Sequence, residues 1–305
     1  MSNPRTLFDP DKVPIGITPT LWWNDDFISI DIGIPFGQCV SEMALAGYEG
    51  CSIGHKYPTD PAVLKPALQL RNLRVSEPWV STYFTIGMKQ QTVELFQRQM
   101  DFLEQMGSTD MVVAEFGQAV NPLPLPVFAD RPIFDNQQWG ALCEGLNDLG
   151  RMANDKGMRL CYHPHMGTGV ITEEDIDRLM GSTDPSLVHL LLDTGHLEFG
   201  GVSAHKIAQT YGHRIKHIHL KNVRSDVVNQ ARQKNFSFQD AIEAGVFTVP
   251  GDPEGAIDFT PIFQSLVAAK FEGWLVIEAE QDPAKANPLE YAKMAREFLR
   301  QNLGY

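Results

Sequence analysis

The chain has 305 residues, and a hydrophobic content of 43% is enough for one barrel-sized domain or two smaller ones. Its 25 Lys and Arg residues stand against 38 Asp and Glu residues, and the net charge of −13 repels phosphate backbones, so nucleic acid is not an expected partner. The 4 cysteines are far apart and form no C-x-x-C pair, which excludes a zinc ribbon and a disulfide scaffold.

The N-terminal segment, residues 1–17, has prolines and charges where a signal peptide needs a continuous apolar run. Elsewhere no apolar run approaches membrane-spanning length. We therefore expect a cytoplasmic protein with reduced thiols and no membrane partner.

Short apolar segments alternate along the chain with longer amphipathic ones, a rhythm typical of βα units around a parallel sheet. The eight predicted strands are residues 13–19, 48–53, 73–79, 111–115, 159–163, 188–193, 215–220 and 274–278. Predicted helices between them include residues 92–107, 136–157, 171–181 and 287–303. Because no Gly-rich phosphate loop follows any strand, this α/β alternation favours a (β/α)8 TIM barrel over an open sheet, as a single domain over residues 1–305.

Two connections are long for a barrel, namely residues 117–136 after the fourth strand and residues 223–273 before the eighth. Both follow the C-terminal ends of strands, and in barrel enzymes the active face lies there. We therefore expect both segments to lie over the active site as loops.

Ionisable residues collect at the C-terminal ends of predicted strands four to eight, where barrels carry their catalytic groups. They are Glu115, then His163 and His165, then Asp193 and His196, then His217, His219 and Lys221, and finally Glu278 and Glu280. Side chains two apart on an extended strand share a face, so the histidine pairs and the glutamate pair each point one way. Mixed imidazole and carboxylate donors suit a divalent first-row metal such as Mn, Co, Fe or Zn better than Mg or Ca.

Each of these residues also has an ordinary structural explanation. A single strand histidine is more often a hydrogen-bonded core residue than a ligand. Glu115 could cap a helix or pair with Arg131, Lys221 could pair with either glutamate, and Glu280 could be a solvated loop residue. The coincidence on four successive strands is what favours a metal site.

Aromatic residues near the other strand ends could line the same pocket. Trp22 and Trp23 follow the first strand, His55 follows the second, and Trp79 ends the third. Aromatic rings can cover the apolar faces of a ring-shaped substrate, although packing in the core explains tryptophans equally well.

The motifs D-T-G-H, H-I-H-L-K-N and V-I-E-A-E on consecutive strands resemble the xylose-isomerase-like barrels. The combination of "YHPHMGTGV", "LLLDTGHLEFGGV" and "VIEAEQDPAKANPLEYA" most resembles the inosose dehydratase family of inositol catabolism within that superfamily. The resemblance covers nearly the whole chain.

This resemblance implies a metal site with Asp193, His219 and Glu278 as ligands. The family ligand after strand five is a glutamate, and His163 holds that place here, so either His163 is a ligand or the metal uses His165 or Glu280 instead. Co²⁺ or Mn²⁺ is the implied metal, and the family is also reported to respond to glutathione.

The implied reaction removes water from a cyclic keto-polyol, 2-keto-myo-inositol, through a metal-stabilised enediolate, and yields a trihydroxycyclohexane dione. Its candidate acid and base groups are His165, Glu280 and Lys221. Expected substrate contacts are His196, Glu115, Trp22 and His55. The alternatives are a metal-dependent keto-sugar isomerase or epimerase, and a sugar-binding barrel without catalysis. A homo-oligomer is common among soluble enzymes.

Overall fold

The computed structural model describes residues 6–25 and 27–305, so the first five residues of the N-terminal segment lie outside the described residues. The strands are β1 (Ile15–Ile17), β2 (Gly50–Cys51), β3 (Arg74–Val75), β4 (Trp79–Thr82), β5 (Asp110–Glu115), β6 (Arg159–Tyr162), β7 (Val188–Asp193), β8 (Ile215–Leu220), β9 (Asn222–Val223), β10 (Phe247–Thr248) and β11 (Trp274–Ile277). No helix among the described residues is both long enough and apolar enough to span a bilayer.

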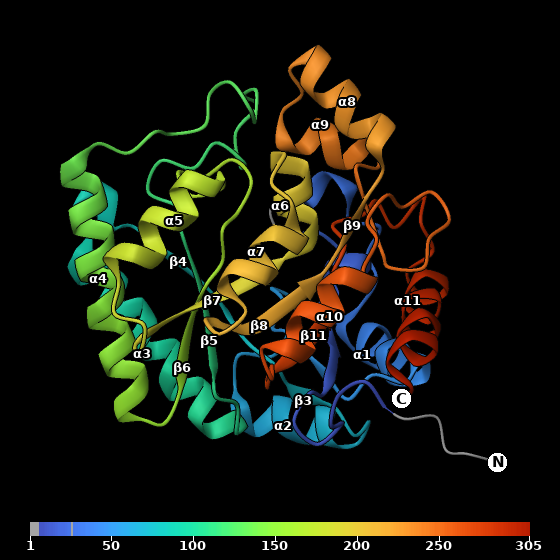
Figure 1. Cartoon of the computed structure of the whole chain (residues 1–305). Coiled ribbons are helices and arrows are strands. Elements are labelled where there is room, and N and C mark those ends of the chain that lie inside the picture. The colour runs from blue at the N-terminus through green and yellow to red at the C-terminus, as the bar shows by residue number, and fades with distance from the viewer. Residues whose placement is uncertain (1–5, 26) are drawn as a thin grey trace.

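Helices follow most of these strands and form an outer layer around them (Figure 1). The α-helices are α1 (Phe36–Ala46), α2 (Pro61–Gln69), α3 (Lys89–Met106), α4 (Asn136–Asp155), α5 (Glu173–Ser182), α6 (Thr194–Gly200), α7 (Ala204–Tyr211), α8 (Ser225–Lys234), α9 (Phe238–Glu243), α10 (Thr260–Ala268) and α11 (Pro288–Leu303). Three short 3-10 helices are η1 (Pro19–Leu21), η2 (Ile28–Ile30) and η3 (Phe84–Ile86).

The main sheet is parallel and closes into a barrel, which confirms the predicted fold class. Its strand order is β3-β2-β1-β11-β8-β7-β6-β5-β4, so the two ends of the order are consecutive in the chain. Both ends belong to the predicted third strand, which Ser76, Glu77 and Pro78 divide into two pieces. Proline has no N–H to donate to a ladder, which explains why the strand is interrupted at Pro78.

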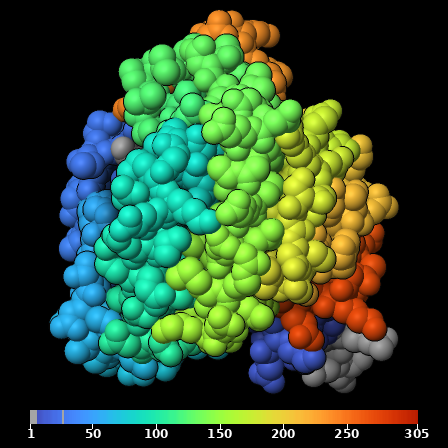
Figure 2. All heavy atoms as spheres, turned by 90° about the vertical axis from the view of Figure 1, so that its left-hand side faces the viewer, coloured from blue at the N-terminus to red at the C-terminus, as the bar shows by residue number. Residues whose placement is uncertain are grey.

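Side chains of the helices fill the space between the helical layer and the outside of the barrel. In α4, for example, Asp135 and Gln138 form a capping box at the start, and Leu142, Leu146 and Leu149 at helical spacing are fully buried. The face shown in Figure 2 is covered by α3 and α4, with the segment between β5 and α4 lying above them.

The barrel interior is filled in layers that rise toward the C-terminal ends of the strands. The indole of Trp274 fills the lower end, where a Cβ on Gly50 would lie 2.5 Å from its ring. A separate apolar cluster of Val112, Cys161 and Leu191 lies inside the barrel, apart from the core under the helices. Polar side chains occupy the remaining interior and lead up to the cavity described below.

The segment 223–273 is not the loop expected from the sequence. Within it, β9 and β10 form an antiparallel hairpin, and α8, α9 and α10 are helical. Its expected position is confirmed, because Phe238 of α9 and Phe247 of β10 contact the ring of His196 with centroids 5.9 and 5.3 Å away. The other long segment joins this cover through a 3.0 Å hydrogen bond from the Val127 N–H to the Phe236 carbonyl.

Candidate active site

A cavity of about 130 Å³ opens at the C-terminal ends of the barrel strands. Its walls are formed by Thr18, Pro19, Thr20, Asn24, Asp25, Ser52, Ile53, Glu77, Pro78, Trp79, Val112, Phe116, His163, His165, His219, Glu278 and Glu280. The part of the wall at the ends of β1 and β2 carries the hydroxyls of Thr18, Thr20 and Ser52, and the rest of the wall carries the histidines and glutamates.

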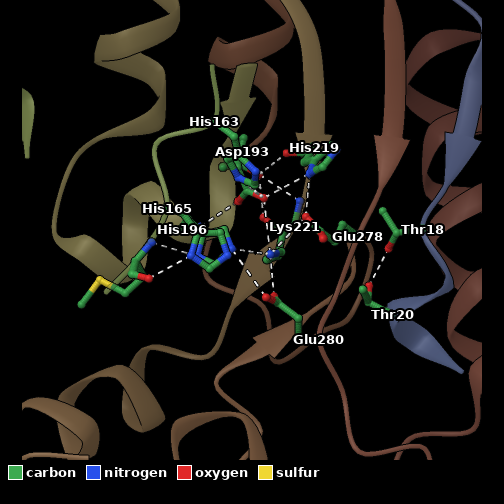
Figure 3. Close-up of polar contacts among 12 residues, drawn as sticks. Thr18, Thr20, His163, His165, Asp193, His196, His219, Lys221, Glu278 and Glu280 are labelled. Carbon is green, nitrogen blue, oxygen red and sulfur yellow. Dashed lines mark hydrogen bonds and ion pairs between the residues drawn. The ribbon is translucent and has the colours of Figure 1, made fainter. Parts of the chain in front are cut away.

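The first cluster on that wall joins His163, Asp193 and His219, whose potential ligand atoms all lie within 4.8 Å of one another (Figure 3). Oδ2 of Asp193 is 3.4 Å from Nε2 of His163 and 3.6 Å from Nδ1 of His219. Glu278 extends the cluster, since its Oε2 is 2.7 Å from the same Nδ1. The carboxylates and the rings therefore converge from the ends of β6, β7, β8 and β11.

Local structure explains why Asp193 stands at this point. It ends β7 and is the N-cap of α6, where its Oδ1 accepts a 2.7 Å hydrogen bond from the His196 N–H. Its other oxygen is thereby directed to the cluster. The following Gly195 is required by space, because a Cβ there would lie 2.4 Å from Cγ of Lys221.

The donor set of this cluster fits a divalent cation. Five of its buried atoms form no hydrogen bond among the described residues, although several of them lie within ion-pair distance of one another; they are Nδ1 and Nε2 of His163, Oδ2 of Asp193, Nδ1 of His219 and Oε2 of Glu278. Buried polar atoms are rarely left unpaired, so a group such as an ion is expected among them. Ligand atoms about 2.1 Å from one ion are separated by about 3.0 to 3.4 Å, close to most of the spacings here.

Burial lowers the pKa of His163 to about 3, against smaller opposing effects of Asp193. The ring is therefore neutral at physiological pH, as a metal ligand must be.

The second cluster joins Lys221, Glu280 and His196. Nζ of Lys221 lies 2.5 Å from Oε2 of Glu280 and 2.9 Å from Nε2 of His196, with 3.1 and 3.4 Å contacts to Glu278 and Asp193. Burial would lower the pKa of Lys221, but these three carboxylates outweigh it and raise that pKa well above its ordinary value. Burial would raise the pKa of Glu280, but Lys221 and His196 lower it, so both members of the pair are ionised.

The charges of the two clusters add up to a cation requirement. Asp193, Glu278 and Glu280 bring three carboxylates around one ammonium, that of Lys221. When His163 and His219 are in the neutral form that a metal ligand requires, two negative charges of these carboxylates remain, and one divalent cation balances them; without an ion, the raised pKa of His219 lets a proton there supply part of that balance. An uncompensated buried charge is costly, so this balance also favours an ion at the cluster.

His165 lies on the cavity wall beside these clusters, and its hydrogen bonding defines its tautomer. Nδ1 is 2.9 Å from the Met166 carbonyl oxygen, a contact that requires the proton on Nδ1 and leaves the lone pair on Nε2. Burial, together with His196 and His163, lowers its pKa well below the ordinary value. A neutral imidazole with a free lone pair is suited to accept a proton.

Three of the predicted substrate contacts lie away from the cavity. The buried indole of Trp22 donates to Glu42 of α1 over 2.6 Å, and His55 pairs with Asp25 behind the wall. Glu115 is buried and accepts from the hydroxyls of Thr82 and Thr85, both at 2.8 Å, and from two N–H groups of η3. Its role in holding turns agrees with the alternative in which it caps a helix, so these three residues are not retained as substrate contacts.

The fourth predicted contact, His196, is fully buried and lies behind His165, with ring centroids 3.8 Å apart. It is absent from the cavity wall as described, so its position favours a link between His165 and Lys221 over a substrate contact. Six predicted residues do line the cavity, namely Trp79, His163, His165, His219, Glu278 and Glu280.

Sequence reasoning missed Glu77, which lines the cavity although it is only 2% exposed. Its Oε1 is 3.3 Å from Nε2 of His219 and its Oε2 is 3.3 Å from Nε2 of His217. The available signal was a carboxylate inside an otherwise strand-like segment, directly before Pro78.

The parallel barrel and the buried histidine and carboxylate side chains at the C-terminal ends of its strands define a TIM-barrel enzyme. A family model described as "Xylose isomerase-like TIM barrel" matches residues 42–302, and the chain belongs to that family. An inosose dehydratase of Geobacillus thermodenitrificans is 48% identical over 299 residues, covering 98% of this chain and 100% of that protein. An inosose dehydratase of Clostridium tetani is also 48% identical, over 97% of this chain and 99% of its own length.

Among solved structures, the fold is shared with the IOLI protein, described with a bound zinc atom. The two superimpose with a TM-score of 0.70 at 14% identity, over 96% of this chain and 98% of that one. At this identity the likeness concerns the fold.

Proposed function

We propose that this chain is an inosose dehydratase that removes water from 2-keto-myo-inositol in inositol catabolism. The observation that carries the proposal is the 48% identity to two inosose dehydratases over almost the full length of each chain. The site supplies a base, an acid pair and an ion-binding cluster around one cavity, which are the groups that this elimination needs.

His165 acts as the base in this proposal. With Nδ1 anchored on the Met166 carbonyl, Nε2 can take the proton from the carbon next to the ketone. The C–H bond electrons move into the ring of the substrate and form an enediolate. His165 is then an imidazolium ion beside the neighbouring ring of His196.

Lys221 and Glu280 act as the acid pair. Glu280 lines the cavity, whereas Lys221 is fully buried behind it at 2.5 Å. A proton from Lys221 reaches the departing β-hydroxyl through Glu280, so the C–O bond breaks and water leaves. The resulting enol becomes the dione by returning to its keto form. His165 then loses its proton to solvent through the cavity, and the acid pair regains one in the same way; His196 holds Lys221 in place at 2.9 Å from Nζ.

The proposed metal ligands are His163, Asp193, His219 and Glu278. When bound, a divalent cation supplies Lewis-acid stabilisation of the negative charge that develops on the ketone oxygen. Two imidazoles and two carboxylates favour Mn²⁺ or Co²⁺ over Mg²⁺. A response to glutathione, a homo-oligomeric assembly and a cytoplasmic location stay predictions from the sequence.

The cavity walls suit a cyclic polyol. The indole of Trp79 is 37% exposed and packs edge-on against Phe116 with ring centroids 5.3 Å apart, so an apolar surface faces the cavity. Hydroxyls of Thr18, Thr20 and Ser52 line another part of the wall. A hydroxylated six-membered ring has apolar C–H faces and a polar edge, which match these two parts.

The test is incubation of the purified protein with 2-keto-myo-inositol, followed by absorbance and NMR. A dehydratase forms a dione with a new chromophore and releases water. An isomerase or epimerase returns the proton and forms only an isomer without that chromophore. Formation of an isomer alone, or no conversion with Mn²⁺ or Co²⁺ present, would contradict the proposal.

A further inference from the structure

A row of buried charged side chains runs down the barrel interior from the proposed metal ligands. Below His219, Nε2 faces Oε1 of Glu77 at 3.3 Å, and the other oxygen of Glu77 is 3.3 Å from Nε2 of His217. Nδ1 of His217 is 3.0 Å from Oδ2 of Asp110, and the Arg159 guanidinium lies 2.6 Å from Oδ1 of the same carboxylate. Asp110 and Arg159 begin β5 and β6, so the row reaches the opposite end of the barrel.

Acidic and basic side chains alternate along this row. Glu77 lies between the two histidines, and Asp110 lies between His217 and Arg159. Glu77, His217 and Asp110 are 2%, 0% and 0% exposed, so an unbalanced charge here would be strongly destabilising.

His219 is the point where this row meets the proposed metal ligands. Its Nδ1 faces Glu278 at 2.7 Å and Asp193 at 3.6 Å, whereas its Nε2 faces Glu77 at 3.3 Å. A ring that donates its Nε2–H to a carboxylate keeps a lone pair on Nδ1. Such a partner also fixes the plane of the ring and increases its basicity as a ligand.

We propose that Glu77 is a positioning residue for the metal site, which fixes the tautomer and orientation of His219 and is itself held by His217, Asp110 and Arg159. The inference rests on the proposed metal site. The role of Glu77 explains why a glutamate lies between β3 and β4, at the level of the barrel where its carboxylate reaches His219.

The experiment compares Co²⁺ binding by wild type and Glu77→Gln, with the visible absorption of Co²⁺ and titration calorimetry as readouts. The variant removes the charge behind His219, and we expect a Kd weaker by about 10- to 100-fold, with an altered absorption band. Asp252→Asn is the matched control, because Asp252 is also a buried carboxylate but pairs with Arg224 outside the cavity. It should lower thermal stability and leave the Co²⁺ Kd unchanged.

Folding of each variant is checked by circular dichroism without metal. A folded Glu77→Gln protein with the Kd and the absorption band of wild type overturns the proposal. If this variant does not fold, Glu77→Asp takes its place, since it retains the charge but withdraws it by one methylene. A weaker Kd then supports the proposal and an unchanged Kd overturns it. Absence of Co²⁺ binding by wild type would instead refute the metal site itself.

Discussion

Replacement of His165 by Asn tests the proposed base most selectively. The Asn amide nitrogen can take the position of Nδ1 and donate to the Met166 carbonyl, which now lies 2.9 Å from Nδ1, whereas nothing replaces Nε2. Loss of a general base typically lowers kcat by about 10²- to 10⁴-fold, or about 2.7 to 5.4 kcal/mol. Metal binding should be retained, since His165 belongs to a different cluster from His163, Asp193 and His219.

The assay follows the dione chromophore at saturating substrate and Mn²⁺, together with exchange of the α-proton into deuterated water. Both rates should fall in the variant. His213→Asn is the control, because His213 is exposed and lies outside the cavity. A kcat within threefold of wild type would refute the assignment of His165 as base. A variant that had lost its Mn²⁺ would instead make His165 a ligand.

Three further results are expected. Gly195→Ala places a Cβ 2.4 Å from Cγ of Lys221, so the ammonium is displaced and steady-state kcat falls; an unchanged kcat would be inconsistent with the acid pair. Burial would lower the pKa of His219, but the adjacent carboxylates raise it, so Co²⁺ must displace a proton there and bind more tightly as pH rises. Calorimetry in buffers of different ionisation enthalpy measures that release, and a pH-independent Kd contradicts it. Trp79→Ala exposes the cavity wall and should raise KM about tenfold with a smaller effect on kcat.

The barrel itself was predictable because short, largely apolar strand segments alternate along the chain with longer amphipathic helices. β7 and β8 have the predicted bounds, residue for residue, and the polar residues that follow them do lie at the cavity end. The sequence predicted the third strand as one piece, residues 73–79, because the apolar residues of this short segment suggest a strand despite Glu77 and Pro78. The break has a local cause in Pro78, which has no N–H to donate, and a tertiary one, because Glu77 turns inward to the two histidines of β8.

The directions of side chains beyond the strand ends were not predictable. The strand-end rule places Glu115 on the active face, but two hydroxyls and two backbone N–H groups hold its carboxylate in the turns. The sequence predicted a loop where α8 and α9 lie, because both helices are short and largely polar. Their few apolar residues are buried only by tertiary contacts within the cover of the site.

The central claim is that water removal depends on an ion held by His163, Asp193, His219 and Glu278. The most direct measurement is the rate of dione formation from 2-keto-myo-inositol by metal-stripped protein, before and after addition of Mn²⁺ or Co²⁺. We predict that the stripped protein is folded but inactive and that either ion restores the rate. Full activity of the stripped protein, unchanged by either ion, would contradict the claim.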